Sequence, residues 1–350
     1  MTGRLIVSRG VGGRELKNVD IGIPTRPATQ YLHSAVESVV AQTHRDWHLH
    51  VSVNGTDGGE AASQLERVAD PRVSWSLTGA ELSASQNSNR ALRAGAAPYV
   101  ATLHDDDRWR PEFLKSHVDF LEQNPQCGFV FSGVMLLDGR GKVLGPKLPS
   151  IEAGVHPSER ISERLFRGNL VNVAAVVVRR SALEAVGGAF REDIVFFDHE
   201  LWIRLASRFD VGVLHRCDGE YRLHPKAASW EKRLELGQRR LEVLAATEEY
   251  AQVGTRTLER AYGSAYAMAA LDAVERGDRR EAVALLGRVV NAFPGSVRAP
   301  GTLMRTVGAA LALASGGLGR RLLTGYRLRG ATGGRPGRLL RLRLAARLRQ

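Results

Sequence analysis

Short runs in which apolar and polar residues alternate recur through the first 130 residues of the chain. Residues 19–23 alternate in this way and end at Pro24, and residues 48–53 repeat the pattern, as expected for strands. Between them, the apolar residues of 32–40 share one face of a helix. We expect further strands at 73–77, 99–103 and 128–132, and helices near 65–70, 86–94 and 111–123. Alternating strands and helices predict an α/β fold, with a mostly parallel, Rossmann-like central sheet flanked by helices and ligands at the carboxyl ends of its strands.

The pattern becomes irregular after about residue 146 and entirely helical after about residue 229. Asp278, followed by Glu281 three residues later, is typical of a helix N-terminus, and this helix should run to Phe293. In the irregular part we expect a loop at 146–157, strands at 173–178 and 211–214, and helices at 181–186 and 198–208. The chain is thereby divided into an N-terminal tail at 1–18, an α/β domain at 19–229, an all-helical C-terminal extension at 230–319 and a basic tail at 320–350.

Composition narrows the class of protein. With 43% hydrophobic and 25% charged residues the chain lies in the globular range. Its two cysteines, Cys127 and Cys217, exclude a disulfide scaffold and a zinc site built from several thiolates. Neither a signal peptide nor an apolar stretch long enough to span a bilayer is evident, so we expect a cytoplasmic protein.

Positive charge is concentrated in the tail. The net charge is +12, but residues 320–350 contain ten arginines and no acidic residue, which leaves about +2 for the rest. Base-stacking aromatic residues are missing from the tail except for Tyr326, so we expect no nucleic-acid partner. Residues 338–349 place leucines at four-residue spacing among arginines. This pattern predicts either peripheral contact with the inner face of the cell membrane or a solvated terminus.

The apolar run 99–103 ends directly in His104, Asp105, Asp106 and Asp107. Adjacent carboxylates repel one another, and a hard cation such as Mg²⁺ or Mn²⁺ gives a folded protein a reason to gather them. The alternative is a solvated turn whose aspartates cap the next helix. Its place after a strand of the predicted parallel sheet favours the metal.

Two later segments carry further candidate residues. Asp198 precedes the apolar pattern of a helix and is either a general base or a residue that caps that helix. Glu200 is a second candidate base, although we expect it at the surface of the same helix. His224 either ligates a metal or contacts a diphosphate, unless it is an ordinary loop histidine.

Taken in order, six motifs between residues 19 and 229 resemble those of the family-2 glycosyltransferases, which have a GT-A fold and invert the anomeric centre. The motifs are Ile-Pro-Thr-Arg at 23–26 with Ser-x-x-x-Gln-Thr at 38–43, Asn-Gly-Thr-Asp at 54–57, the Asn-containing helix at 87–90, the aspartate cluster at 105–107, Gly-Gly-x-Phe at 187–190 with Leu-Trp-x-Arg-Leu at 201–205, and Tyr-Arg-x-His-Pro at 221–225. The chain also departs from the family. His104 stands for the first aspartate of Leu-Asp-x-Asp-Asp, Phe197 stands for one acid of the pair that ends in Asp198, and the aspartate that contacts the base falls near Val53 or Asn54.

The resemblance implies a metal-dependent glycosyltransferase that moves a sugar from a nucleoside-diphosphate sugar to an acceptor hydroxyl with inversion. The acceptor would be a glycan or a lipid-linked sugar in cell-surface polysaccharide or glycolipid synthesis. Asp198 would be the base, and Asp106 and His224 would hold Mg²⁺ or Mn²⁺. The implied donor-binding residues are Pro24, Thr25, Arg26, Asn54, Asn89, His104 and Asp105.

Two other functions remain open at this point. A sugar nucleotidyltransferase also uses acidic residues and metal on a related sheet, but it would carry a glycine-rich phosphate loop where this chain has residues 21–27. A catalytically silent nucleotide-sugar-binding homologue is the other alternative, because two acids of the family pattern are replaced.

Overall fold

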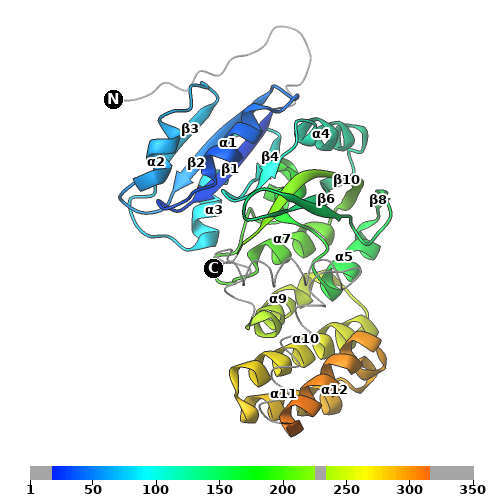
Figure 1. The fold of residues 1–350 in the computed structure, drawn as a ribbon. Coiled ribbons are helices and arrows are strands. Elements are labelled where there is room, and N and C mark those ends of the chain that lie inside the picture. Colours follow the sequence, from blue (N-terminus) through cyan, green and yellow to red (C-terminus); the bar gives the residue numbers. More distant parts are fainter. Residues whose placement is uncertain (1–17, 225–233, 316–350) are drawn as a thin grey trace.

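The parallel half of the sheet contains the four strands nearest the N-terminus. In the computed structural model, which describes residues 18–224 and 234–315, these strands run in the order β3-β2-β1-β4 (Figure 1). They are β1 (Val19–Thr25), β2 (Trp47–Val53), β3 (Val73–Leu77) and β4 (Tyr99–Thr102). All three pairings are parallel, so the carboxyl ends of β1, β2 and β4 meet at one edge.

Helices cover both faces of this half. On one face, α1 (Leu32–Val40) and α2 (Gly59–Leu65) pack with Ile21 and Ile23 in one core cluster. Helix α3 (Ala84–Leu92) covers the other face. A Cβ atom added to Gly22 would point to this face and lie 3.0 Å from Ala91 of α3. A glycine at this position therefore lets α3 approach the strand closely.

The second half of the sheet is mixed: it contains one parallel pair of strands, and its other pairs are antiparallel. The whole order is β3-β2-β1-β4-β9-β6-β10-β5, with β7 beside β6 and β8 beside β10. The strands are β5 (Arg108–Trp109), β6 (Cys127–Asp138), β7 (Val143–Lys147), β8 (Gly154–His156), β9 (Val176–Arg179) and β10 (Asp210–Leu223). Strand β9 is antiparallel to both β4 and β6, so it is a single reversed strand between two parts of the sheet that run in the same direction.

Several local expectations for this half were wrong in extent. Residues 146–157 contain the end of β7 and all of β8, and β10 runs nine residues beyond Leu214 to Leu223. The expected strand at 173–178 begins as a 3-10 turn, Val173–Ala175. The remaining helices of this half are α4 (Phe113–Gln123), α5 (Ser158–Arg167), α6 (Arg180–Ala185) and α7 (Phe197–Ala206).

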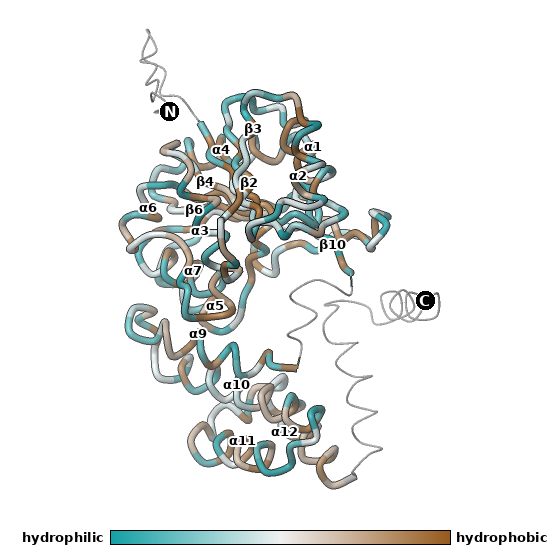
Figure 2. Tube along the Cα trace, turned by 90° about the vertical axis from the view of Figure 1, so that its left-hand side faces the viewer, coloured by the Kyte–Doolittle hydropathy of each residue, from teal (hydrophilic) through white to brown (hydrophobic). Residues whose placement is uncertain are grey.

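The helical region lies below the sheet in Figure 1 and is centred on its longest helix, α10. Its elements are α9 (Leu236–Ala251), α10 (Thr255–Arg276), α11 (Arg279–Ala292), the 3-10 helix Pro294–Arg298 and α12 (Pro300–Ser315). Helix α9 packs on α5 and α7. Helices α11 and α12 pack on α10 and lie at the end of the molecule farthest from β3 (Figure 2).

The N-terminus of α11 is capped as the sequence predicted, because the Asp278 carboxylate accepts a hydrogen bond from the Glu281 N–H at 2.9 Å. The Glu281 carboxylate itself binds Arg276. In the described part of the chain, none of the helices has the length and apolar character needed to cross a bilayer. The expectations for residues 1–17 and for the basic tail at 320–350 lie outside the described residues.

The contact between α9 and α10 gives a prediction about stability. A Cβ atom on Gly237 would lie 2.0 Å from the Ala269 backbone nitrogen, whereas a Cβ atom on Gly287 of α11 would meet nothing within 4 Å. We expect Gly237→Ala to lower the free energy of unfolding by about 1–3 kcal/mol through overpacking. Gly287→Ala, the matched control, should leave it unchanged or raise it by roughly 0.5–1 kcal/mol. Urea unfolding of both variants measures the difference, and equal stability would contradict the close packing.

Candidate functional site

The carboxyl ends of β1 and β4 are joined by a hydrogen bond between side chains. Thr25 Oγ1, at the end of β1, donates to Asp105 Oδ2 at 2.5 Å. Burial, together with the negative charge of Asp106, raises the pKa of the Asp105 carboxyl. Asp105 therefore points toward β1.

Asp106 points instead toward the end of β10. His224, which follows that strand, donates from Nε2 to Asp106 Oδ2 at 2.8 Å. Burial acts to raise the pKa of Asp106, but the hydrogen bond from His224 and the nearby His104 outweigh it, so the pKa is lowered overall. The His224 ring lies against Tyr31, with 5.3 Å between ring centroids. His224, which lies 118 residues farther along the chain, thus helps to hold Asp106 as a carboxylate.

Asp107 is the most deeply buried of the three aspartates. Its Oδ1 atom accepts a hydrogen bond from the Arg222 N–H at 2.8 Å, and its side chain is otherwise enclosed. Its Oδ2 atom has no hydrogen-bond partner within residues 18–224 and 234–315. Burial and the charge of Asp106 raise the pKa of Asp107 well above its usual range. A buried carboxylate oxygen without a donor is costly, and a cation would relieve that cost.

These side chains fit a divalent cation. His104, Asp106 and Asp107 each offer one ligand atom, and these atoms lie within 4.8 Å of one another. The sequence assigned His104 to the donor and His224 to the metal, whereas the structure groups His104 with the aspartates and connects His224 through its bond to Asp106. Asp107 belonged to the predicted acidic cluster but was given no role of its own there. Its signal was its place as third of three consecutive aspartates after a buried strand.

Asp198, the predicted base, lies on α7. It lies in the first turn of the helix rather than at the capping position, which Phe196 occupies. Asn169 Nδ2 donates to Asp198 Oδ2 at 3.4 Å, and burial raises the pKa of the Asp198 carboxyl. The electrostatic influence of His104 on Asp198 links α7 to the end of β4. Asp198 is thus within electrostatic range of His104, one of the three side chains of the candidate metal group.

Glu200 is not a surface residue, so that expectation was wrong. Its side chain is fully buried and pairs with Arg204, with Oε1 and Nε 2.8 Å apart. Tyr250 of α9 also donates its hydroxyl to Glu200 Oε1. Sequence reasoning missed this role because α9, which covers this face of α7, lies about fifty residues farther along the chain.

Two predicted donor-binding asparagines hold loops instead. Asn89 Nδ2 donates to the Phe190 carbonyl at 2.8 Å, and Asn89 Oδ1 accepts from the Phe190 N–H at 2.9 Å. Asn54 makes the same pair of bonds with the backbone of Leu82, at 2.9 and 2.8 Å. Both amides are occupied by protein backbone, so we assign these residues to positioning rather than to donor contact. Pro24, Thr25 and the exposed Arg26 remain at the open end of β1.

Arg204 completes the support of the loop that contains Phe190. Its guanidinium donates to the carbonyls of Val186, Gly188 and Ala189 at 2.6, 3.1 and 2.6 Å. This loop is thereby held from α7 on one side and from Asn89 of α3 on the other.

A comparison with known protein families finds a match within the α/β domain. Residues 20–184 match the model of the family Glycosyl transferase family 2. TuaG of Bacillus subtilis, which is named as a glycosyltransferase of teichuronic acid biosynthesis, is 24% identical over 220 residues, covering 61% of this chain and 82% of TuaG. WfgD of Escherichia coli, named as a UDP-Glc:alpha-D-GlcNAc-diphosphoundecaprenol beta-1,3-glucosyltransferase, is 21% identical over 221 residues, covering 62% of this chain and 82% of WfgD.

Solved structures show the same fold. TarS residues 1–349 of S. aureus, in complex with UDP-GlcNAc, superpose with a TM-score of 0.62 at 13% identity, covering 89% of this chain and 91% of that one. The mannosyltransferase PcManGT of Pyrobaculum calidifontis, in complex with GDP-Man and Mn²⁺, gives a TM-score of 0.52 at 15% identity, covering 84% and 87%. The match to TarS therefore extends well beyond residues 20–184, and the GT-A fold expected from the sequence is confirmed.

The buried Asp107 carboxylate gives a prediction about metal binding. We expect Mn²⁺ to raise the unfolding temperature of the protein, because a ligand present at 100 times its Kd stabilises the folded state by about 2.7 kcal/mol. Asp107→Asn removes a charged ligand and should abolish this increase, while the metal-free variant stays at least as stable because repulsion from Asp106 is relieved. Asp119→Asn, on α4, is the control and should respond like the unchanged protein. Differential scanning fluorimetry with and without Mn²⁺ tests this, and a full response of Asp107→Asn would contradict the metal assignment.

Proposed function

The α/β domain of this chain belongs to family 2 of the glycosyltransferases, and from that premise we propose that the protein transfers a sugar from a nucleoside-diphosphate sugar to an acceptor hydroxyl with inversion. The observation that carries the proposal is the group of ligand atoms formed by His104, Asp106 and Asp107, together with an electrostatic influence of His104 on Asp198. This group follows β4, where parallel strands end, which is where α/β sheets bind ligands.

The donor would lie across the ends of β1 and β4. Thr25 holds Asp105 in place, and Arg26 is exposed at the same edge, where its guanidinium suits a nucleotide. Asn54 fixes the loop at 79–82 that borders the end of β2. His104, Asp106 and Asp107 would hold Mg²⁺ or Mn²⁺, and His224 would keep Asp106 ionised and oriented. When bound, such an ion offsets the charge that develops on the departing diphosphate.

Asp198 would act as the general base. Its raised pKa reflects burial, and a carboxylate that holds a proton more strongly than usual is suited to accepting one from a hydroxyl. Asn169 orients one of its oxygens at 3.4 Å. In a single displacement the acceptor oxygen bonds to the anomeric carbon, the bond from that carbon to the diphosphate oxygen breaks, and the hydroxyl proton passes to Asp198. Attack opposite the departing diphosphate inverts the configuration.

We infer an acceptor from the cell envelope, either a glycan or a lipid-linked sugar. Support comes from the names of TuaG and WfgD, the second of which includes a diphosphoundecaprenol acceptor. A cytoplasmic enzyme with such an acceptor would work at the inner face of the membrane. The Arg-rich residues 320–350, which lie outside the described part of the chain, would supply peripheral contact there.

Replacing Asp106 tests the transfer reaction. We expect Asp106→Asn to remain folded and to lose more than tenfold in turnover, equivalent to at least about 1.4 kcal/mol of barrier, because the cation would lose a charged ligand. Nucleotide release from a panel of nucleoside-diphosphate sugars, with and without Mn²⁺, measures this and identifies the donor. Asp119→Asn again serves as the control. Near-normal turnover by folded Asp106→Asn would exclude the assigned role, and no turnover of any donor by the unchanged protein would favour the silent homologue.

Replacing Asp198 should reduce the rate of catalysis, whereas replacing Glu200 should reduce the stability of the fold. Asp198→Asn should reduce kcat by roughly a hundredfold or more with little change in KM for the donor, as expected for loss of a general base. Glu200→Gln should instead lower the unfolding temperature, because it leaves Arg204 and Tyr250 with a weaker buried partner. Steady-state kinetics and thermal unfolding of both variants separate the two effects. A larger kinetic loss from Glu200→Gln than from Asp198→Asn would show that the base is wrongly assigned.

A further inference from the structure

The most exposed residues of α12 are all nonpolar. Its large exposed side chains are Leu303, Met304, Val307 and Leu311, with exposed fractions of 44, 54, 46 and 64%. The other exposed positions between 300 and 314 are proline, glycine or alanine. Exposed apolar residues are ordinary when they are scattered, but a continuous apolar face on one helix indicates an interaction surface.

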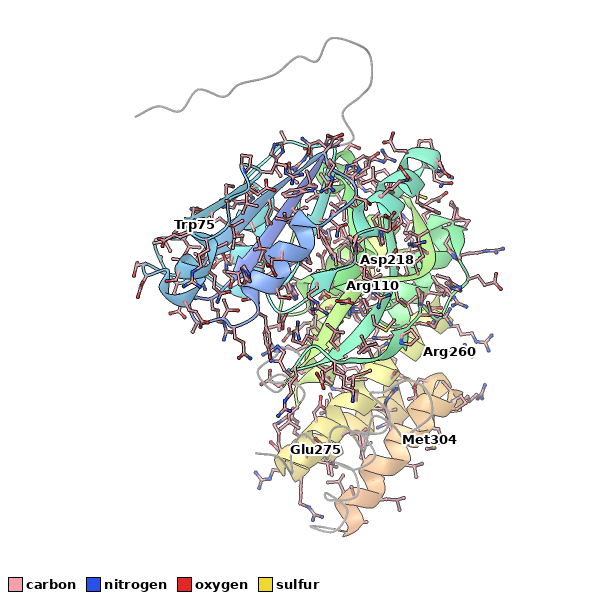
Figure 3. The ribbon with its side chains drawn as sticks, turned by 45° about the horizontal axis from the view of Figure 1, so that its top comes forward. Trp75, Arg110, Asp218, Arg260, Glu275 and Met304 are labelled. Carbon is pink, nitrogen blue, oxygen red and sulfur yellow. The ribbon has the colours of Figure 1, made fainter. Side chains whose placement is uncertain are left out.

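The spacing places these residues on one stripe. Leu303, Val307 and Leu311 repeat every four residues, and Met304 adjoins them. The opposite side of α12 is buried against α10 and α11 through Ala309 and Ala312. The helix has sixteen residues and is therefore about 24 Å long. Met304 lies at the end of the molecule opposite Trp75 of β3, so the stripe is far from the sheet (Figure 3).

The segment of chain that contains α12 carries charge of one sign. Glu281 is the last acidic residue, and residues 282–350 contain 13 arginines, no lysine and no carboxylate side chain. Of these arginines, Arg298 is exposed just before α12 begins. An apolar stripe on a helix with cationic residues before it suits the interface of an anionic bilayer, where apolar side chains enter the headgroup region and cations meet lipid phosphates.

We propose that the exposed face of α12 binds the surface of an anionic membrane, with its apolar side chains at the level of the headgroups and the exposed Arg298 against lipid phosphates. This inference rests on the membrane location proposed above and assigns the apolar part of the contact to a described helix rather than to the tail. Each arginine near such a surface contributes on the order of 1 kcal/mol.

Charge disfavours the other occupants of this face. A second copy of the chain seated on α12 would bring two carboxylate-free segments of 13 arginines together, and like charges repel. The chain's own residues 316–350 are equally basic and would add cations without a counterion. An anionic lipid surface satisfies both the apolar stripe and the arginines.

The helical region would transmit this contact to the candidate site. Helix α12 packs on α10, α10 packs on α9, and Tyr250 of α9 donates to Glu200 of α7. Asp198 lies two residues before Glu200 on the same helix. Binding at α12 would therefore hold the sheet edge at a fixed height above the bilayer, as a lipid-linked acceptor requires.

The test is co-sedimentation of the full chain with vesicles of phosphatidylglycerol and phosphatidylcholine. The double variant Leu303→Gln/Val307→Gln should bind roughly tenfold or more weakly than the unchanged chain, because two apolar anchors are lost. Val143→Gln/Leu148→Gln, which changes two side chains that are each 50% exposed elsewhere, is the matched control and should bind normally. Binding should fall at high salt and on vesicles of phosphatidylcholine alone.

Equal binding by the α12 variant and the unchanged chain, or binding by neither, would overturn the proposal. Light scattering without vesicles adds a second criterion, since a dimer that dissociates only in the α12 variant would assign the face to a second copy. A chain ending at Gly319 separates the tail from α12, because binding that depends on the tail alone would leave the α12 variant unaffected. Donor hydrolysis in solution should be the same for the α12 variant and the unchanged chain, so a failure of the catalytic assignment would be visible separately.

Discussion

Three consecutive carboxylates at the end of a buried strand are the constraint around which the site is built. Asp105, Asp106 and Asp107 cannot share one environment as free charges, because repulsion in a buried setting is strong. The fold separates them by giving each a different partner: the Thr25 hydroxyl, the His224 ring and the Arg222 N–H. Since these partners come from β1 and from the end of β10, the cluster ties together three strands that are distant in the sequence.

Buried polar pairs outside the aspartate cluster hold a neighbouring loop and helix in place. The Glu200–Arg204 pair holds the loop before Phe190, and Asn89 holds Phe190 itself from α3. Tyr250 joins this network from α9, so the helical region is bonded to the helix that carries Asp198. A buried ion pair of this kind adds little net stability, but losing one partner is costly, which makes it suited to fixing geometry.

Local sequence patterns predicted the elements, and long-range contacts decided the roles. Strand β4 and its aspartates were predicted because an apolar run ends directly in charge, and the fold and family that the motifs suggested are confirmed. The antiparallel insertion of β9 was not predicted, because direction within a sheet depends on pairing rather than on periodicity. Burial of Glu200 and the backbone bonds of Asn89 likewise depend on segments far along the chain, where one sequence carries no local signal.

The central claim is that the carboxyl end of β4 holds a divalent cation together with a nucleoside diphosphate, facing Asp198. A crystal structure of the protein with Mn²⁺ and a nucleoside diphosphate, read by anomalous scattering at the manganese edge, tests it most directly. We expect one strong anomalous peak within coordination distance of the Asp106 carboxylate, in contact with the diphosphate and on the side that faces Asp198. A diphosphate bound elsewhere, or bound at β4 with no anomalous peak at saturating Mn²⁺, would contradict the claim.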